Sequence, residues 1–325
     1  MVRVFRRFVL LGAVALVIAA CGDSSGDGGT GTTDAATTTA VPPTTETSED
    51  TTTTEAEDGT STTMDLEGDL LPPPVEPANF NDPTNVDNKW YPLVPGTQLV
   101  FEGVTLEDGE DESPPRVIFT VTDLTKVIAG IETVVIWDED YEEGDLVETE
   151  IAFFAQDDEG NVWLMGEYPE EFEDGQLDKT PAWIHGVDDA QAGILVPGDP
   201  QEGTDSFAQG WAPAVEWTDR GIVFEVGSET CVPVDCYEDV LIIDEFNPDE
   251  PGIFQVKYYA PGVGNVEIGF KGNDPSGETL ELVEYKVLSE DELAAAREAA
   301  LGLEARAYEF VPETYGETEP IQGPG

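Results

Sequence analysis

The sequence predicts a mainly β fold, in which an antiparallel sheet is followed by a single C-terminal helix. From residue 79 to about residue 288, short runs rich in Val, Ile, Phe, Tyr and Trp alternate with Gly, Asp, Asn and Pro. Several of the connections are too short for a parallel crossover, which needs a dozen or more residues. No apolar period of helix length occurs inside this region. We therefore expect residues 79–288 to form one barrel-like or sandwich-like β domain.

The expected strands share a β-branched and aromatic composition, and turn residues bound them. They are Gln98–Glu102, Arg116–Thr122, Glu132–Trp137, Leu146–Ala155, Asn161–Gly166, Ala182–His185, Ile222–Val226, Val240–Glu245, Phe254–Ala260, Val263–Phe270 and Thr279–Leu288. Tight hairpin turns are expected at Glu143–Asp145, Asp157–Asn161 and Asn273–Gly277.

One helix is predicted after the sheet, over residues 289–307. Ser289 and Glu292 have the spacing of a capping box, in which each side chain receives the other residue's backbone N–H. Apolar side chains then recur at helical spacing, at Leu293, Ala296, Ala300 and Leu303. Residues 308–325 contain proline, glycine and acids, and we expect a disordered tail there.

The first 20 residues have the features of a signal peptide. Three arginines lie within residues 1–7, and an apolar run follows from Phe8 to Ala20. This run is too short to cross a bilayer as a helix, which takes about 20 residues. Cys21 directly follows Ala19 and Ala20, and the segment resembles the lipobox of bacterial lipoproteins. That resemblance implies cleavage before Cys21 and a diacylglycerol on its thiol, and hence an anchor on the extracytoplasmic face of the cell membrane. The alternative is a plain signal peptide with a chance cysteine.

Residues 21–78 are expected to form a tether between the lipidated cysteine and the folded domain. The segment is rich in threonine and acidic residues and contains no aromatic side chain. Such a composition cannot bury enough apolar surface to offset the entropy of ordering.

The charge of the chain excludes some partners. It carries 70 acidic and 13 basic residues, a formal net charge of −57. Nucleic-acid binding is excluded because phosphates require a basic face. Anionic lipid headgroups would also repel the chain, so membrane attachment must come from acyl chains. We interpret the acidity as an adaptation to a saline or cation-rich exterior, with a specific cation-binding role as the alternative.

The two remaining cysteines, Cys231 and Cys236, suggest a local disulfide. Four residues separate them, and an exported protein meets an oxidising compartment. A zinc site is improbable because the chain has no second cysteine pair and His185 is its single histidine.

Three segments resemble motifs of uncharacterised exported β domains, including actinobacterial lipoproteins. Trp90–Thr97 is similar to their opening motif, an aromatic residue with Pro-Leu and Pro-Gly-Thr before the first strand. Tyr258–Val266 resembles their closing hairpin, and Phe154–Trp163 resembles their central hairpin. The resemblance implies an antiparallel, strongly curved sheet over residues 79–288, such as the half-barrel of a lipoprotein carrier. It implies no established activity and supplies no catalytic residue.

Motifs that carry chemistry are few. His185 is the only histidine available as a base, no Gly-x-Ser-x-Gly elbow occurs, and no phosphate-binding glycine loop occurs. We expect no cofactor, and a carboxylate-based hydrolase is the alternative function. Asp138, Asp140 and Asp145 are the best candidates for weak Ca²⁺ binding, although a solvated hairpin tip is the default interpretation of this segment.

Aromatic residues leave two interpretations open. They either fill the core or line a concave face that holds a small apolar, lipid or glycan ligand. The candidates for such a pocket are Phe154, Trp163, Trp183, Trp217, Tyr258 and Tyr259. Together these observations predict an exported, lipid-anchored, non-catalytic binding or envelope-interaction module.

Overall fold

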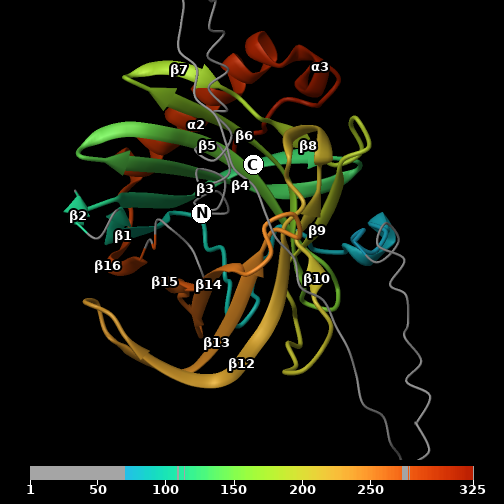
Figure 1. The fold of residues 1–325 in the computed structure, drawn as a ribbon. Coiled ribbons are helices and arrows are strands. Elements are labelled where there is room, and N and C mark those ends of the chain that lie inside the picture. Colours follow the sequence, from blue (N-terminus) through green and yellow to red (C-terminus); the bar gives the residue numbers. More distant parts are fainter. Residues whose placement is uncertain (1–69, 108–109, 113, 273–276, 278, 325) are drawn as a thin grey trace, which may run out of the picture.

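The computed structural model describes residues 70–107, 110–112, 114–272, 277 and 279–324. The expected signal peptide, Cys21 and most of the expected tether lie outside these residues. The folded part consists of one large antiparallel sheet with two helices at its C-terminal end (Figure 1).

The strands in chain order are β1 (Thr97–Glu107), β2 (Glu110–Glu112), β3 (Arg116–Ile128), β4 (Ile131–Glu142), β5 (Asp145–Gln156), β6 (Val162–Glu173), β7 (Gln176–Lys179), β8 (Trp183–Ile184), β9 (Gln191–Val196), β10 (Phe207–Ala208), β11 (Gly210–Trp211), β12 (Arg220–Cys231), β13 (Cys236–Phe246), β14 (Ile253–Ala260), β15 (Gly264–Gly272) and β16 (Thr279–Val287). The helices are α2 (Glu290–Phe310), α3 (Pro312–Tyr315) and the short 3₁₀ helices η2 (Pro77–Asn79) and η3 (Pro213–Val215).

Two meanders make up the sheet. In the first, β3, β4, β5 and β6 each pair with the next strand, and in the second β12 to β16 do the same. β1 joins the meanders because it pairs with β16 on one side and with β3 on the other. Figure 1 shows the sheet bending so that the two meanders form the opposing arms of a curved sheet. The predicted mainly β, antiparallel, curved fold with a C-terminal helix is confirmed.

One short segment contacts both ends of this open sheet. Phe207 and Ala208 pair with β12, whereas Gly210 and Trp211 pair with β9 at the opposite end. A Cβ on Gly210 would lie 2.3 Å from the indole nitrogen of Trp217, so only glycine fits at this crossing.

The arms enclose an inner core, and the helices cover an outer core. Inner-core side chains come from both arms, including Phe119, Phe154, Ile243 and Tyr259. The outer core lies between the first arm and the helices α2 and α3. Strand β5 faces both cores, because Ala152 and Phe154 point inward while Ile151 and Phe153 point outward.

The capping box begins α2 as predicted. The Ser289 hydroxyl accepts from the Glu292 N–H, and the Glu292 carboxylate accepts from the Ser289 N–H at 2.8 Å. Two bidentate ion pairs then attach the helix to the first arm. Arg297 donates to Asp123 at 2.5 and 2.6 Å, and Arg306 donates to Glu170 at 2.6 and 2.9 Å.

The C-terminal segment differs from the expected disordered tail. Residues 312–315 form α3, and Tyr315 and Ile321 are buried. Gln322 then pairs with Thr125 through two backbone hydrogen bonds of 3.1 and 2.7 Å. Docking against β3 orders this segment, and its own composition does not reveal that contact.

Candidate functional site

The predicted pocket aromatics occupy the two cores rather than one exposed concave wall. Phe154, Trp183, Trp217 and Tyr259 are buried in the inner core. Trp163 is buried in the outer core, on the side covered by the helices. Tyr258 is half-buried on the face of β14 opposite to that of Tyr259, and it packs against the inner core as well as against a third cluster formed by Val240, Ile242 and Val256. The six residues therefore do not form a common pocket.

Inner-core aromatics contact polar groups as well as each other. The Trp183 indole N–H donates to the Glu167 carboxylate at 2.8 Å. The Trp183 and Trp217 rings stack with their centroids 6.5 Å apart. Tyr91 lies against Phe154 on one arm and Tyr259 on the other, at centroid distances of 5.9 and 5.8 Å. Tyr91 thus connects the two arms across the interior.

A buried carboxylate stands on the second arm beside Tyr259. Glu245 accepts a hydrogen bond from Gln209 at 2.8 Å and another from the Tyr259 hydroxyl at 3.3 Å. The ammonium nitrogen of Lys257 lies 3.8 Å from its other oxygen. Gln255 lies directly opposite Glu245 in the strand register.

The first arm carries a set of carboxylates that we call the acidic wall. On β4 and β5, Asp138 lies directly opposite Glu150. Asp140 lies opposite Glu148, which in turn lies opposite Glu171 on β6. The acidic wall consists of Asp138, Asp140, Glu148, Glu150 and Glu171.

The acidic wall faces the interior. In the β3–β4 register, Phe119 lies opposite Asp138 and Val117 lies opposite Asp140. Both partners belong to the inner core, and directly opposed residues of an antiparallel pair share a face. Exposure falls along β4 from the half-buried Asp140 to Asp138, which is 2% exposed. The wall therefore extends from partly solvated positions into the core.

Tyr91 links Asp138 and Glu150 of the wall electrostatically to Glu245 on the second arm. Burial raises the pKa of Tyr91 well above its ordinary value, and the charges of Asp138, Glu245 and Glu150 raise it further. Burial, followed by the charge of Glu245, also raises the pKa of Tyr259. Both hydroxyls therefore stay protonated at neutral pH and can donate hydrogen bonds.

The three aspartates predicted to bind Ca²⁺ occupy different environments. Asp138 and Asp140 belong to the acidic wall, whereas Asp145 is exposed at the start of β5, opposite Glu142. In the part of the chain that the structure describes, no group of three or more His, Cys, Asp or Glu side chains is placed to hold a metal ion.

His185 has a structural position. Its Nδ1 accepts a hydrogen bond of 3.1 Å from the Ala192 N–H. Burial lowers the pKa of His185, which favours the neutral ring that this acceptor role requires.

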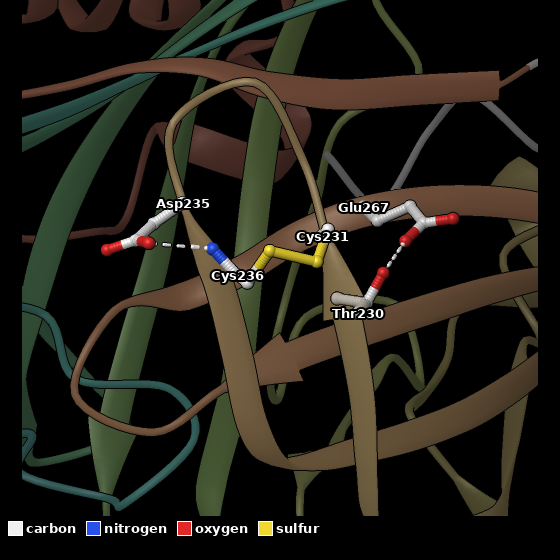
Figure 2. Close-up of a disulfide and its surroundings, with 5 residues drawn as sticks. All are labelled: Thr230, Cys231, Asp235, Cys236 and Glu267. Carbon is white, nitrogen blue, oxygen red and sulfur yellow. Dashed lines mark hydrogen bonds between the residues drawn. A yellow bond between two sulfur atoms is a disulfide. The ribbon is translucent and has the colours of Figure 1, made fainter.

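The disulfide lies at the hairpin tip between β12 and β13, where Cys231 and Cys236 are directly paired (Figure 2). The Asp235 carboxylate accepts from the Cys236 N–H at 2.8 Å, and the Thr230 hydroxyl bonds to Glu267. These contacts fix a largely exposed turn, in which Val232 is buried against the inner core.

The closing motif contacts the residue that directly precedes the opening motif. The Gly262 N–H donates to the Lys89 carbonyl at 2.8 Å and so joins the closing motif to the segment before the opening motif. Beside this contact lies a hollow of about 460 Å³, lined mainly by residues 84–89 and 92–95. Asn88 stabilises its rim, because its side chain donates to two carbonyls and accepts two backbone N–H groups.

The sequence analysis missed the acidic wall as a unit, although a signal for it is present. Asp138 and Asp140, like Glu148 and Glu150, are two positions apart on a strand. Acids at this spacing share one face. That spacing does not encode which strands lie side by side. It therefore cannot show whether the two pairs of acids meet.

Comparisons with known proteins establish no family for the chain. No protein-family model matches it, and no curated protein matches it. A protein of Parabacteroides distasonis assigned as a lipoprotein aligns with 12% identity and a TM-score of 0.37, over 61% of this chain and 99% of that one. A protein of Bacteroides fragilis assigned as exported, with a YmcC-like fold, aligns with 13% identity and a TM-score of 0.35, also over 61% and 99%. Similarity at this level carries no argument about activity or ligand.

A helix must be both long and predominantly apolar to cross a membrane. None of the helices in the described residues meets both conditions.

Proposed function

We propose that this protein is a lipid-anchored, extracytoplasmic binding module that holds a ligand against the inner face of its curved sheet. The anchor is Cys21, and the threonine-rich segment after it is the tether. The folded domain provides the binding surface.

The observation that carries the binding role is the polar composition of the inner face. Asp138 and Glu150 of the acidic wall on one arm and Glu245 on the other act together on Tyr91, in a region where apolar packing would cost less free energy. Buried charges are costly, so a fold that required only stability would be expected to place apolar residues there. Recognition of a polar ligand gives these side chains a role.

Labelling with a clickable fatty acid tests the anchor. We expect the wild-type protein to be labelled in cells of the source organism and Cys21→Ser to remain unlabelled and be released from the membrane fraction. Equal labelling of both proteins, or of neither, would contradict an anchor at Cys21.

Intrinsic fluorescence tests ligand binding, because Trp183 and Trp217 lie in the inner core. Small molecules from the cell envelope, separated at neutral pH into cationic, neutral and anionic fractions, are titrated into the detergent-solubilised full-length protein. A saturable change with any fraction supports the proposed function, and no response to any fraction contradicts it. Trp217→Phe should shrink the signal with little change in affinity, because the Trp217 indole nitrogen has no hydrogen-bond partner to lose.

The hydrolase alternative gains no specific support from the described residues. Asp138 and Glu150 are cross-strand neighbours, but their pairing alone does not favour bond cleavage over binding.

A further inference from the structure

We propose that the hollow between residues 84–89 and 92–95 binds a small, uncharged molecule that has an apolar body and one hydrogen-bond acceptor, such as a carbonyl oxygen. This site goes beyond the proposed function, because its lining contains none of the residues on which that proposal rests. The size of the hollow, its apolar lining, its fixed rim and its charges support the assignment.

The first support is the size and the lining of the hollow. Its volume is about 460 Å³, and small-molecule sites typically enclose about 300–1,000 Å³. Val86 and Leu93 line it and belong to the inner core, whereas Val94 at its edge is 54% exposed. Pro92 and Pro95 add further apolar surface. An apolar molecule in the hollow would remove this surface from water, which favours binding.

The second support is that the hollow is preformed. The Asn88 side chain donates to the carbonyls of Gly160 and Pro197, at 2.8 and 3.2 Å. The Asn88 backbone N–H donates to the Gln156 side chain at 2.8 Å. The two prolines of the lining fix their own backbone φ angles. Such a rim needs little ordering when a ligand binds, and this lowers the entropic cost of binding.

The charges around the hollow favour an uncharged ligand. Among the described residues that line it, Lys89 is the only cation and Asp87 the only anion. Lys89 already forms an ion pair with Asp239, and the chain as a whole carries a net charge of −57, so an anion would be repelled. A cation in the hollow would be repelled by the Lys89 ammonium.

Lys89 provides the hydrogen-bond donor. Its ammonium donates to the Asp239 carboxylate at 2.5 Å and lies 4.3 Å from the centre of the Trp90 ring. An ammonium group has three N–H donors, and the Lys89 side chain is 47% exposed, so a donor remains for a ligand. A carbonyl oxygen accepts this hydrogen bond without adding charge to the hollow.

Photolabelling with benzophenone tests the site on the detergent-solubilised full-length protein. Benzophenone is uncharged and apolar, carries one carbonyl oxygen, and reacts with nearby C–H bonds when it is irradiated. Mass spectrometry of the digested protein then locates the label. We expect saturable labelling concentrated within residues 84–95. The anionic analogue para-benzoylbenzoate should half-saturate this segment at a concentration at least about fivefold higher at low salt.

Two substitutions and their matched controls test the roles of individual side chains. Val94→Ser removes an apolar contact and should raise the half-saturating concentration of benzophenone about fivefold. Lys89→Met removes the donor, keeps the apolar stem and should also raise it about fivefold. The controls make the same changes outside the hollow, at the exposed Val234 and at Lys286, and should stay within about twofold of the wild-type value. Circular dichroism of each variant establishes that the sheet is retained.

Three results would overturn the proposal: labelling that does not saturate within residues 84–95, equal labelling by benzophenone and its anionic analogue, or equal effects of a substitution and its control. The inner-face proposal is judged separately by the fluorescence titrations. A fluorescence response without labelling of the hollow would remove this site and leave the proposed function standing. Labelling of the hollow without any fluorescence response would do the reverse.

Discussion

Two glutamates of helix α2 illustrate how position determines the role of one residue type. Glu292 is exposed in the first turn and closes the capping box with Ser289. Glu304 is buried, accepts from Lys126 at 2.8 Å, and receives the Ile321 N–H on both oxygens. The first fixes where the helix begins, and the second holds a distant segment against the sheet.

Glu292 should titrate far below an ordinary glutamate. The Ser289 N–H, followed by the Ser289 hydroxyl and Lys286, lowers the pKa of Glu292 to about 2. An unfolded glutamate has a pKa of about 4.3. Because the folded value is the lower one, the stability that Glu292 contributes is present above the unfolded pKa and is lost as the pH falls through about 2.

NMR titration of the Glu292 carboxyl carbon measures this midpoint. Ser289→Ala removes the hydroxyl but keeps the backbone donor, so the titration midpoint should rise only part of the way toward the unfolded value of about 4.3. Lys286→Met should also raise it part of the way, because Lys286 lowers the pKa through both a hydrogen bond and its charge. A wild-type midpoint near 4.3 would contradict the capping geometry.

At the scale of elements, the buried ion pair between Lys126 and Glu304 holds the C-terminal segment against the sheet. Lys126 on β3 is fully buried, and its ammonium also donates to the Glu319 carbonyl at 2.5 Å. The rings of Phe153, Tyr308 and Tyr315 lie 5.0 to 5.9 Å from this ammonium. The pair therefore joins β3, α2 and the segment after α3.

Glu304→Gln should destabilise the protein by about 3–5 kcal/mol, because it leaves the Lys126 charge buried with neutral acceptors. Denaturant unfolding measures the loss, and hydrogen exchange at Ile321 and Gln322 shows whether the terminal segment detaches. Glu313→Gln makes the same chemical change at an exposed position of α3 and should alter stability by less than about 0.5 kcal/mol. Equal stability of the two variants would mean that the ion pair does not hold the segment.

At the scale of the whole molecule, the net charge of −57 affects the stability of the folded state. Such a charge raises the free energy of the compact state relative to the expanded chain, because folding brings carboxylates together. Salt reduces the range of this repulsion from about 30 Å at 0.01 M to about 8 Å at 0.15 M. Divalent cations can also bridge neighbouring carboxylates at the surface.

The melting temperature should therefore rise with sodium chloride and rise further with millimolar calcium at equal ionic strength. Thermal melts followed by circular dichroism provide the measurement, and magnesium at the same concentration indicates how far the response depends on the ion. Indifference to sodium would contradict the role of self-repulsion. Equal responses to sodium and calcium would contradict only the bridging of carboxylates by divalent cations, and the effect of self-repulsion would stand.

Local pattern accounts for the features that the sequence analysis predicted correctly. Strand composition and short turns predicted the antiparallel sheet, and the three-residue spacing of Ser289 and Glu292 predicted the start of α2. The short strand β9 and the segment 207–211 were not predicted; β9 pairs with β6, and the segment pairs with β12 and β9 at the two ends of the sheet.

Short-range chemistry thus determined the β class, the capping box and the pairing partners of the disulfide, since each depends on residues within a few positions of one another. Only the tertiary structure decided which carboxylates meet. Asp138 and Glu150 face each other because of strand register, and Glu245 joins them because the sheet bends. The same holds for Lys126 and Glu304, which are 178 positions apart. Contacts at such separations depend on how the elements pack against one another, and no local period in the sequence encodes that packing.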